Sequence, residues 1–221
     1  MRVVNIFIIS FYLLFPNHLK SQGISLELMS GIPLNVALPM VVSQQGEQDI
    51  RIKKAHFASD PFLSPIFWDW QIQYNKDSLN GFSIESIHHK LFLKNKPPEI
   101  ERFGISHGYN YIFINRFFSR GNPDLKLNFG LGTVLAHPES TVRGKQFYQH
   151  NGLINWGYYF NGWAVNGGMS YQKKLFGRFF AIVHGKCCFS HSKVPIMDGS
   201  ARLWNLSFML TFGLKYEMWK H

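Results

Sequence analysis

Hydrophobic residues recur at every second position along several stretches of the chain, and the longest stretch runs from residue 202 to residue 218. One face of an extended chain there is wholly apolar: Trp204, Leu206, Phe208, Leu210, Phe212, Leu214, Tyr216 and Met218. The opposite face carries small or polar residues such as Asn205, Ser207 and Thr211. Eight apolar positions at a strict period of two exceed the five or six residues of an ordinary strand. The pattern therefore predicts a long amphipathic β-strand.

Seven other segments show the same alternation. The eight expected strands are residues 24–38, 66–75, 79–93, 103–117, 125–136, 158–172, 177–190 and 202–218. A further segment, residues 48–57 (QDIRIKKAHF), is short and charged, so we expect it in a loop hairpin. If this region added to the barrel, a ten-stranded barrel would be the alternative.

Strand length and connection length both favour a membrane barrel. A tilted strand needs about 9 to 11 residues to cross a bilayer, and bacterial single-chain barrels have an even strand count. Short connections (NKDSLN, SRGNPD and KKLF) alternate with long ones at residues 39–65, 94–102, 137–157 and 191–201. The sequence thus predicts an all-β, eight-stranded antiparallel transmembrane β-barrel, with its termini and short turns on the periplasmic side.

The soluble alternative is a sandwich or lipocalin-like barrel with its apolar faces turned inward. Eight strands enclose only a packed core or one small ligand, and the many aromatic side chains do not fit there. Small residues on the opposite face, such as Gly130, Gly132, Gly162 and Gly168, suit a narrow lumen better.

The N-terminus has the order of a secretory signal. Arg2 precedes the apolar run VVNIFIISFYLLF, and Pro16 and the small residue Ser21 follow it. We expect residues 1–21 to be a signal peptide and residues 22–221 to form the barrel domain. The alternatives are an uncleaved anchor or a buried strand.

The net charge of +10 indicates an acidic partner: nucleic acid, an anionic membrane surface or a phosphorylated lipid. Nucleic acid is disfavoured because the aromatic and polar faces of the strands are separate and because the chain is expected to be exported. Cys187 and Cys188 are adjacent and point to opposite faces, which excludes a disulfide framework. HExxH, P-loop and GxSxG motifs are absent, so neither a cofactor nor a metal is predicted.

The last strand, SFMLTFGLKYEMW, resembles the C-terminal assembly signal of small eight-stranded outer-membrane proteins of Gram-negative bacteria. The resemblance is architectural and covers roughly residues 24–219. It implies the bacterial outer membrane as location, and the barrel-assembly machinery as a partner of the last strand. The chain departs from the signal by continuing with Lys220 and His221.

The expected topology gathers six of the ten histidines toward the external rim, where an outer-membrane protein meets lipopolysaccharide. They are His88, His89, His107, His137, His184 and His191, accompanied by Arg102, Arg143, Lys186 and Lys193.

In size, strand count and placement of these groups, the chain is similar to two barrel enzymes, a lipid A deacylase and a palmitoyltransferase. The resemblance implies hydrolysis or transfer of a lipid A acyl chain. A serine nucleophile needs a base within hydrogen-bond reach and a group that orients the base. The candidates are Ser86 or Ser106 as nucleophile, His88 or His107 as base, and Glu85 or Glu139 as orienting acid.

The strand pattern divides these candidates between two faces. Ser86 and His88 face the lipid, whereas Glu85 and His89 share the lumenal face, so Glu85 could orient His89. The deacylase pattern has His before Ser with one residue between them, and here the order is Ser86-Ile87-His88. A metal site would draw on the same group of residues: His88, His89, His107, His137 and Glu139. Zinc needs converging ligands, however, and the side chains of adjacent His88 and His89 diverge on a strand. A non-enzymatic barrel with a structural or ligand-binding role is the alternative function.

Overall fold

The computed structural model describes residues 23–147, 152–153 and 156–220. The predicted signal peptide, residues 1–21, lies outside them. Within the described residues there is no helix of the length and apolarity that crossing a membrane requires.

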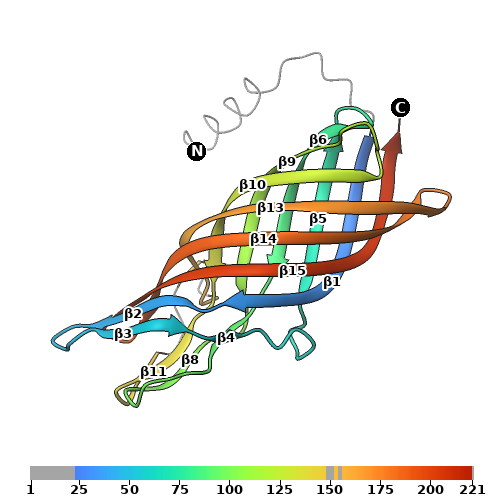
Figure 1. Cartoon of the computed structure of the whole chain (residues 1–221). Coiled ribbons are helices and arrows are strands. Elements are labelled where there is room, and N and C mark those ends of the chain that lie inside the picture. Colours follow the sequence, from blue (N-terminus) through green and yellow to red (C-terminus); the bar gives the residue numbers. More distant parts are fainter. Residues whose placement is uncertain (1–22, 148–151, 154–155, 221) are drawn as a thin grey trace.

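Eight strands close into a ring in which every neighbouring pair is antiparallel. In ring order they are β1 (Gly23–Val36), β5 (Trp68–Asn75), β6 (Asn80–His88), β9 (Tyr109–Phe118), β10 (Leu125–Ala136), β13 (Tyr159–Phe176), β14 (Phe179–Ile196) and β15 (Gly199–Lys220). β1 pairs with β5 on one side and with β15 on the other, which removes both sheet edges. In Figure 1 the wall of β10, β13, β14 and β15 crosses in front of the wall of β1, β5, β6 and β9. The predicted eight-stranded antiparallel barrel is confirmed.

Two further strands extend the ring without joining it. β2 (Leu38–Gln44) continues the direction of β1 and pairs with the first residues of β15. β3 (Ile50–Ala55) pairs with β2. Residues 48–57 therefore belong to a hairpin, as expected, and the ten-stranded main sheet still has a ring of eight.

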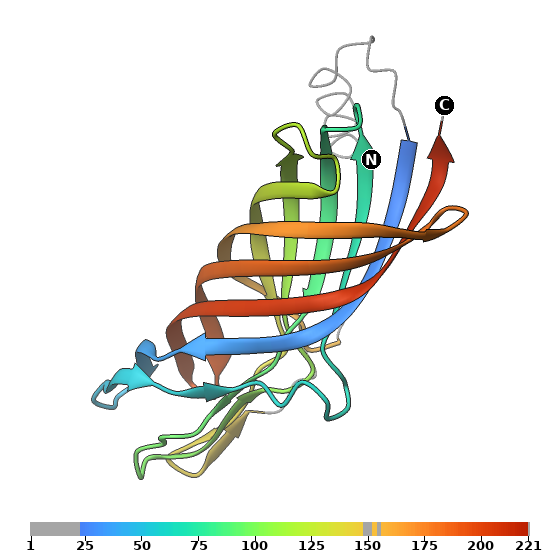
Figure 2. The ribbon, with the colours of Figure 1, turned by 45° about the vertical axis from the view of Figure 1, so that its right-hand side comes forward.

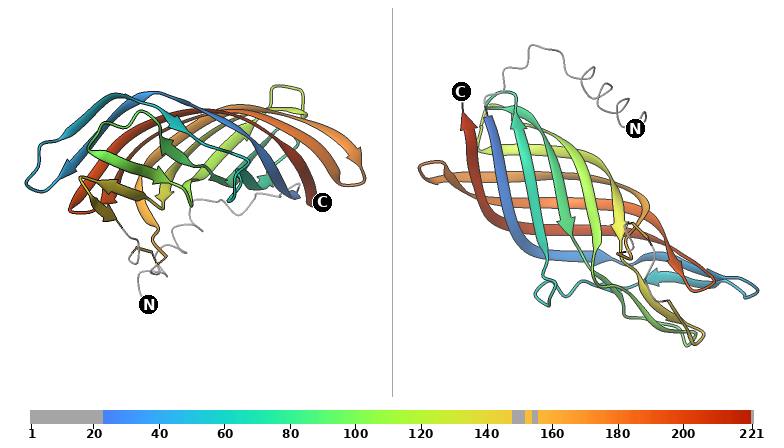
Figure 3. Two further views of the ribbon diagram at one scale, coloured as in Figure 1. Left: turned by 90° about the horizontal axis from the view of Figure 1, so that it is seen from below. Right: turned by 180° about the vertical axis from the view of Figure 1, so that it is seen from behind.

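A second sheet lies at the end of the barrel opposite the C-terminus (Figures 1 and 2). Its strand order is β12 (Lys145–Phe147), β11 (Glu139–Val142), β8 (Ile100–Ile105), β7 (Leu91–Leu93) and β4 (Phe57–Ala58). We call this end of the barrel the loop end, and the end with Gly23 and Lys220 the terminal end. The left panel of Figure 3, seen from below, shows the second sheet beside the ring rather than within its wall.

The second sheet corrects two predicted strands. The segment 79–93 is divided, because β6 ends at His88 and Leu91–Leu93 form β7 in the other sheet. The segment 103–117 is divided likewise at residues 106–108, where Gly108 has φ +130°, a backbone conformation that other residues rarely adopt. β7 keeps the alternation of the ring strands, with Leu91 and Leu93 buried, so the period alone did not reveal its change of sheet.

Two predicted connections were also wrong. Residues 191–201 are not a loop, because β14 and β15 continue to a turn at residues 197–198. Buried Ser192, Val194 and Ile196 continue the inward face there, but the polar composition of the segment hid the strand. KKLF is not a turn either, since β13 runs to Phe176 and the turn follows at Gly177, with φ +52°.

The outward face of the ring is apolar and exposed. Leu131 is 71% exposed and Leu34 is 66% exposed. Others on this face are Leu28, Ile32, Ile72, Ile84, Ile114, Phe129, Met169, Val183, Phe208, Leu210, Phe212 and Leu214. The faces are thus the reverse of those in the soluble alternative, and a surface of this composition requires an apolar solvent.

The lumen near the middle of the ring is filled by charged and polar side chains. The Lys186 ammonium donates hydrogen bonds to Asp69, at 2.5 Å, and to Glu85, and none of the three side chains is exposed. Asn115 and Asn166 each donate to Glu85 at 2.9 Å. Because these groups are closed to solvent, the barrel is not an open aqueous channel at this level.

Toward the loop end, aromatic and aliphatic side chains replace the charged filling, and buried hydroxyl and amide groups such as Ser190 and Asn205 bond the tyrosine hydroxyls. Tyr109, Tyr111 and Phe113 project inward from β9 and are fully buried. They belong to one hydrophobic cluster that also contains Ile105 of the second sheet and Leu203 of β15. The second sheet is therefore held to the ring by a shared core.

Because the outward face of the ring is apolar and exposed, the loss of stability caused by an introduced charge should depend on its position. Leu131→Arg, at mid-strand in β10, should destabilise the barrel by about 2 to 4 kcal/mol, the range for Arg at the centre of a bilayer. Leu63→Arg is the matched control, because Leu63 is 64% exposed in the connection before β5. Unfolding from lipid bilayers, followed by heat-modifiable gel migration, would measure both. Equal tolerance of the two substitutions would contradict a lipid-facing β10.

The buried triad of charges predicts a second effect. Lys186→Met should cost about 3 to 5 kcal/mol of unfolding free energy, because it leaves Asp69 and Glu85 buried without their cation. Adding Asp69→Asn and Glu85→Gln to this variant should recover most of the loss. A triple variant as unstable as Lys186→Met would show that packing, rather than uncompensated charge, is responsible.

Candidate functional site

Two neighbouring strands leave the ring at the same level and bring chemically reactive side chains together. β8 passes into β9 through Ser106, His107 and Gly108, and β10 passes into β11 through His137 and Pro138. The His137 backbone N–H donates to the Gly108 carbonyl at 3.0 Å. Tyr109 pairs with Ala136, and Gly104 pairs with Glu139. The register on both sides of the junction thus sets His107 beside His137.

Glu139 is the centre of this group. The Ser106 hydroxyl donates a hydrogen bond to Glu139 Oε1, and the Arg102 guanidinium donates to Oε2. His107 Nδ1 lies 3.0 Å from Oε1 and 3.0 Å from Ser106 Oγ. We call Arg102, Ser106, His107, His137 and Glu139 the mouth cluster.

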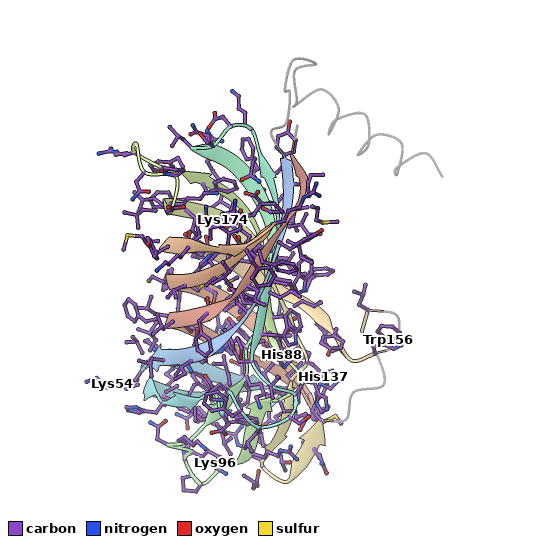
Figure 4. All side chains as sticks on the ribbon, turned by 90° about the vertical axis from the view of Figure 1, so that its right-hand side faces the viewer. Lys54, His88, Lys96, His137, Trp156 and Lys174 are labelled. Atoms are coloured by element: carbon purple, nitrogen blue, oxygen red, sulfur yellow. The ribbon has the colours of Figure 1, made fainter. Side chains whose placement is uncertain are left out.

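The imidazoles of the cluster lie at the surface but are held in place. The His107 side chain is 59% exposed, whereas that of Glu139 is 22% exposed. The rings of His107 and His137 are 4.9 Å apart between centroids, and the His137 ring packs against Tyr158 at 5.0 Å. The Tyr158 hydroxyl donates to the His107 carbonyl at 2.9 Å. Figure 4 places His137 near the level of His88, with Lys96 of the connection between β7 and β8 beyond both.

Two pKa shifts follow from these contacts. Partial burial and the neighbouring His107 lower the pKa of His137. Burial acts to raise the pKa of Glu139, but the hydrogen bond from Ser106 and the charge of Arg102 outweigh it and lower that pKa. At neutral pH the cluster therefore holds a neutral imidazole and an ionised carboxylate.

The geometry gives Glu139 the role of orienting acid and His107 the role of base. In a serine triad the serine lies at one imidazole nitrogen and the acid at the other. Here Ser106 and Glu139 both lie at His107 Nδ1. Glu139 can orient His107 through Nδ1 and leave Nε2 to accept a proton. For Ser106 to attack, its hydroxyl would first have to turn away from Glu139.

The second predicted pair, Ser86 and His88, is not joined by a hydrogen bond. Ser86 lies half-buried on β6. His88 Nδ1 lies 2.8 Å from Asn110 Oδ1, and its ring stacks on Trp68 with centroids 5.4 Å apart. No hydrogen bond links Ser86 to His88 in the part of the chain that the structure describes.

Glu85 and His89 lie inside the barrel with separate partners. Glu85 binds Lys186 and two asparagines, as described above. His89 Nε2 lies 3.0 Å from Asn35 Oδ1, and its ring stacks on Tyr111. His184 and Lys186 are not at the rim, which corrects that expectation. His184 is buried in the lumen with Nε2 3.4 Å from Glu27.

The structure also makes neighbours of two cations, Lys193 and Arg202, that the sequence alone did not bring together. Lys193 of β14 lies directly opposite Arg202 of β15, and both are exposed on the outward face. Neither forms an ion pair with any acidic residue among those described. Like charges in opposite positions of antiparallel strands are unfavourable. The pair would have been found in the sequence if the turn at residues 197–198 had been recognised.

Next to this pair, toward the terminal end, lies an aromatic patch on the same outward face: Trp163, Phe189, His191 and Trp204. The ring of Trp204 lies 4.3 Å from that of His191 and 5.4 Å from that of Phe189, measured between centroids. The patch is two residues, or about 7 Å of strand, from Arg202.

No family model matches the chain, and no curated protein matches it in sequence. Solved structures with a similar arrangement include Neisserial surface protein A, with 12% identity and a TM-score of 0.41 over 90% of this chain and 99% of that one. The attachment invasion locus protein Ail of Yersinia pestis has 13% identity and a TM-score of 0.41 over 88% of this chain and 99% of that one. The outer membrane protein AlkL, solved in lipid bilayers, has 10% identity and a TM-score of 0.49 over 94% of each chain. The fold assignment rests on the strand pairing of this chain itself.

Proposed function

We propose that the protein is a closed barrel of the bacterial outer membrane that acts at the external leaflet by binding the phosphorylated head of a membrane lipid, such as lipopolysaccharide. The reversal of its faces, with exposed Leu131 outside and buried Lys186 inside, supports membrane insertion. Three short turns, at residues 76–79, 119–124 and 177–178, lie at the same end as Gly23 and Lys220, and the periplasmic end of such barrels has short turns. The short β14–β15 turn at residues 197–198 is the exception at the loop end. The loop end then faces outward, and assembly through β15 stays a prediction.

The cation pair is the observation that carries lipid binding. Lys193 and Arg202 face outward, side by side and without an acidic partner among the described residues. A phosphate between them would turn an unfavourable pair into a favourable one.

The aromatic patch supports a position of the cation pair at the depth of a lipid phosphate. Aromatic girdles mark the boundary between the apolar band of a barrel and the headgroup layer. The cation pair stands about 7 Å beyond the patch along the strands, on the loop-end side. This is the level at which a headgroup phosphate would meet the barrel wall.

The lipid proposal predicts a charge-specific loss of binding. Lys193→Gln with Arg202→Gln should weaken binding of phosphorylated lipid A by roughly thirtyfold, because each cation near a membrane surface contributes about 1 kcal/mol. The matched control is Lys53→Gln with Lys54→Gln, which removes two exposed cations from β3. Titration of the purified barrel with lipid A, before and after dephosphorylation, measures the difference. Equal affinities of the two double variants would refute the proposed phosphate site.

A second candidate function is hydrolysis or transfer of a lipid acyl chain by the mouth cluster. It is favoured by one observation, the contact of His107 Nδ1 with both Glu139 and Ser106 at 3.0 Å. In hydrolysis, His107 would take a proton from the attacking group as that group bonds to the ester carbonyl carbon, the acyl C–O bond would then break, and the protonated His107 would return the proton to the leaving alkoxide, which departs as the alcohol. With Ser106 donating to Glu139, water at His107 Nε2 is the nucleophile that requires the least rearrangement.

The acyl-chain hypothesis is tested by mass spectrometry of lipid A from cells with and without the gene. If it holds, the wild-type gene removes or adds one acyl chain, and His107→Gln lowers the rate about 10² to 10⁴-fold, the usual contribution of a general base. Ser106→Ala then distinguishes a serine nucleophile from water, and Ser86→Ala is the control on the ring wall. An acylation pattern that is the same with and without the gene would remove this candidate while leaving lipid binding intact.

A further inference from the structure

The mouth cluster contains a group that its hydrogen bonds leave unexplained. His137 Nδ1 is closed to solvent and has no hydrogen-bond partner among the described residues. A buried ring nitrogen without a partner is costly and requires an explanation, and a bound water or ion is one that also accounts for converging neighbours. His137 belongs to the only set of His, Cys, Asp and Glu side chains among the described residues whose possible ligand atoms converge: His107, His137 and Glu139, with one such atom from each within 4.8 Å of the others.

We infer that His107, His137 and Glu139 bind a divalent transition-metal ion, with Zn²⁺ as the preferred ion. Zinc binds imidazole nitrogen and carboxylate oxygen at about 2.0 to 2.2 Å, so tetrahedral donors lie about 3.4 Å apart. His107 Nδ1 and Glu139 Oε1 are 3.0 Å apart, and the whole set needs movements of about 1 Å to reach this spacing. Two histidines and one glutamate also leave a fourth position for water or an external ligand.

The donor types decide between classes of metal. Ca²⁺ and Mg²⁺ take oxygen ligands, and the converging set offers a single carboxylate. Imidazole suits zinc, copper, nickel and iron, and the carboxylate is compatible with each. Hard cations are therefore disfavoured at this site.

The surroundings already orient the ligands. Arg102 holds Glu139 Oε2 and thereby leaves Oε1 toward the imidazoles. Tyr158 binds the backbone of His107, and the His137 backbone is bound to Gly108. Outer contacts of this kind fix metal ligands, and their loss typically weakens binding by 10 to 100-fold.

The metal inference shares the mouth cluster with the acyl-chain candidate but does not depend on acyl chemistry. It is also separate from the phosphate site, which lies on β14 and β15. Zinc binding is measured without lipid, so failure of either lipid experiment leaves its result unchanged.

The test is calorimetric titration of the purified full-length barrel in detergent, freed of metal by a chelator, with Zn²⁺ and then with Mg²⁺. We expect one equivalent of Zn²⁺ to bind with an affinity lost in His107→Ala, His137→Ala and Glu139→Gln, and Mg²⁺ not to compete. Arg102→Gln should weaken binding by about tenfold or more. The matched control, His56→Ala, removes an exposed histidine from the loop end of the barrel, and this variant should bind Zn²⁺ as the wild type does.

Two further measurements keep the result decisive. Heat-modifiable migration shows that each variant is folded, and the visible absorption of bound Co²⁺ reports whether the ion is four-coordinate. Zinc affinity unchanged in folded His107→Ala and His137→Ala would overturn the inference. An equal loss in His56→Ala would overturn it as well, because binding would then be nonspecific.

Discussion

The pairing of the first strand with the last is the interaction on which the rest of the structure depends. A strand can enter hydrocarbon only if both of its edges are hydrogen-bonded, because lipid offers no partner for a free N–H or C=O group. β1 meets β15 from Gly23↔Lys220 to Val36↔Leu206, so the ring is closed along the full length of β1. Once no edge remains, the outward face is free to be wholly apolar.

Apart from outward-facing cations near the strand ends, such as Lys193 and Arg202, closure with apolar side chains outside places the polar side chains of the ring strands in the lumen. An eight-stranded lumen is narrow, so these groups must satisfy one another. Lys186 between Asp69 and Glu85 meets this requirement in the middle of the ring. Beyond it, toward the loop end, the inward residues are uncharged and largely aromatic or aliphatic, with Tyr109 and Phe113 as examples. That change lets the lumen core continue into the second sheet, so the loop end is a folded part of the barrel rather than a set of loose connections.

The ring was predictable from sequence because its signal is local. In β10 the alternation of Leu125, Phe129 and Leu131 with Lys126 and Gly130 appears unchanged as alternation of exposed and buried positions. The second sheet was not predictable in the same way. β7 and β11 are only three and four residues long and keep the same period, so nothing local shows to which sheet they belong.

The candidate site depended on information that no single segment carries. Ser106, His107 and Glu139 were each named from the sequence, but their meeting requires the pairing of Glu139 with Gly104 across 35 residues of chain. The side chains of His88 and His89 diverge, as expected of adjacent strand residues: His88 meets Trp68, and His89 lies in the lumen against Tyr111. His88 is nevertheless buried rather than exposed to lipid. His137 became important only through the register that sets it beside His107.

The same junction explains why reactive groups gather where they do. The strand pairing is interrupted at residues 106–108 between β8 and β9, and at residues 137–138 between β10 and β11. β8–β9 and β10–β11 break at the same level because they are neighbours in both sheets. Ser106, His107 and His137 from these interruptions thereby meet Glu139, the first residue of β11. Because the backbone on either side is fixed by two sheets, the cluster is preorganised, and binding an ion or a substrate there would require movement of side chains rather than of strands.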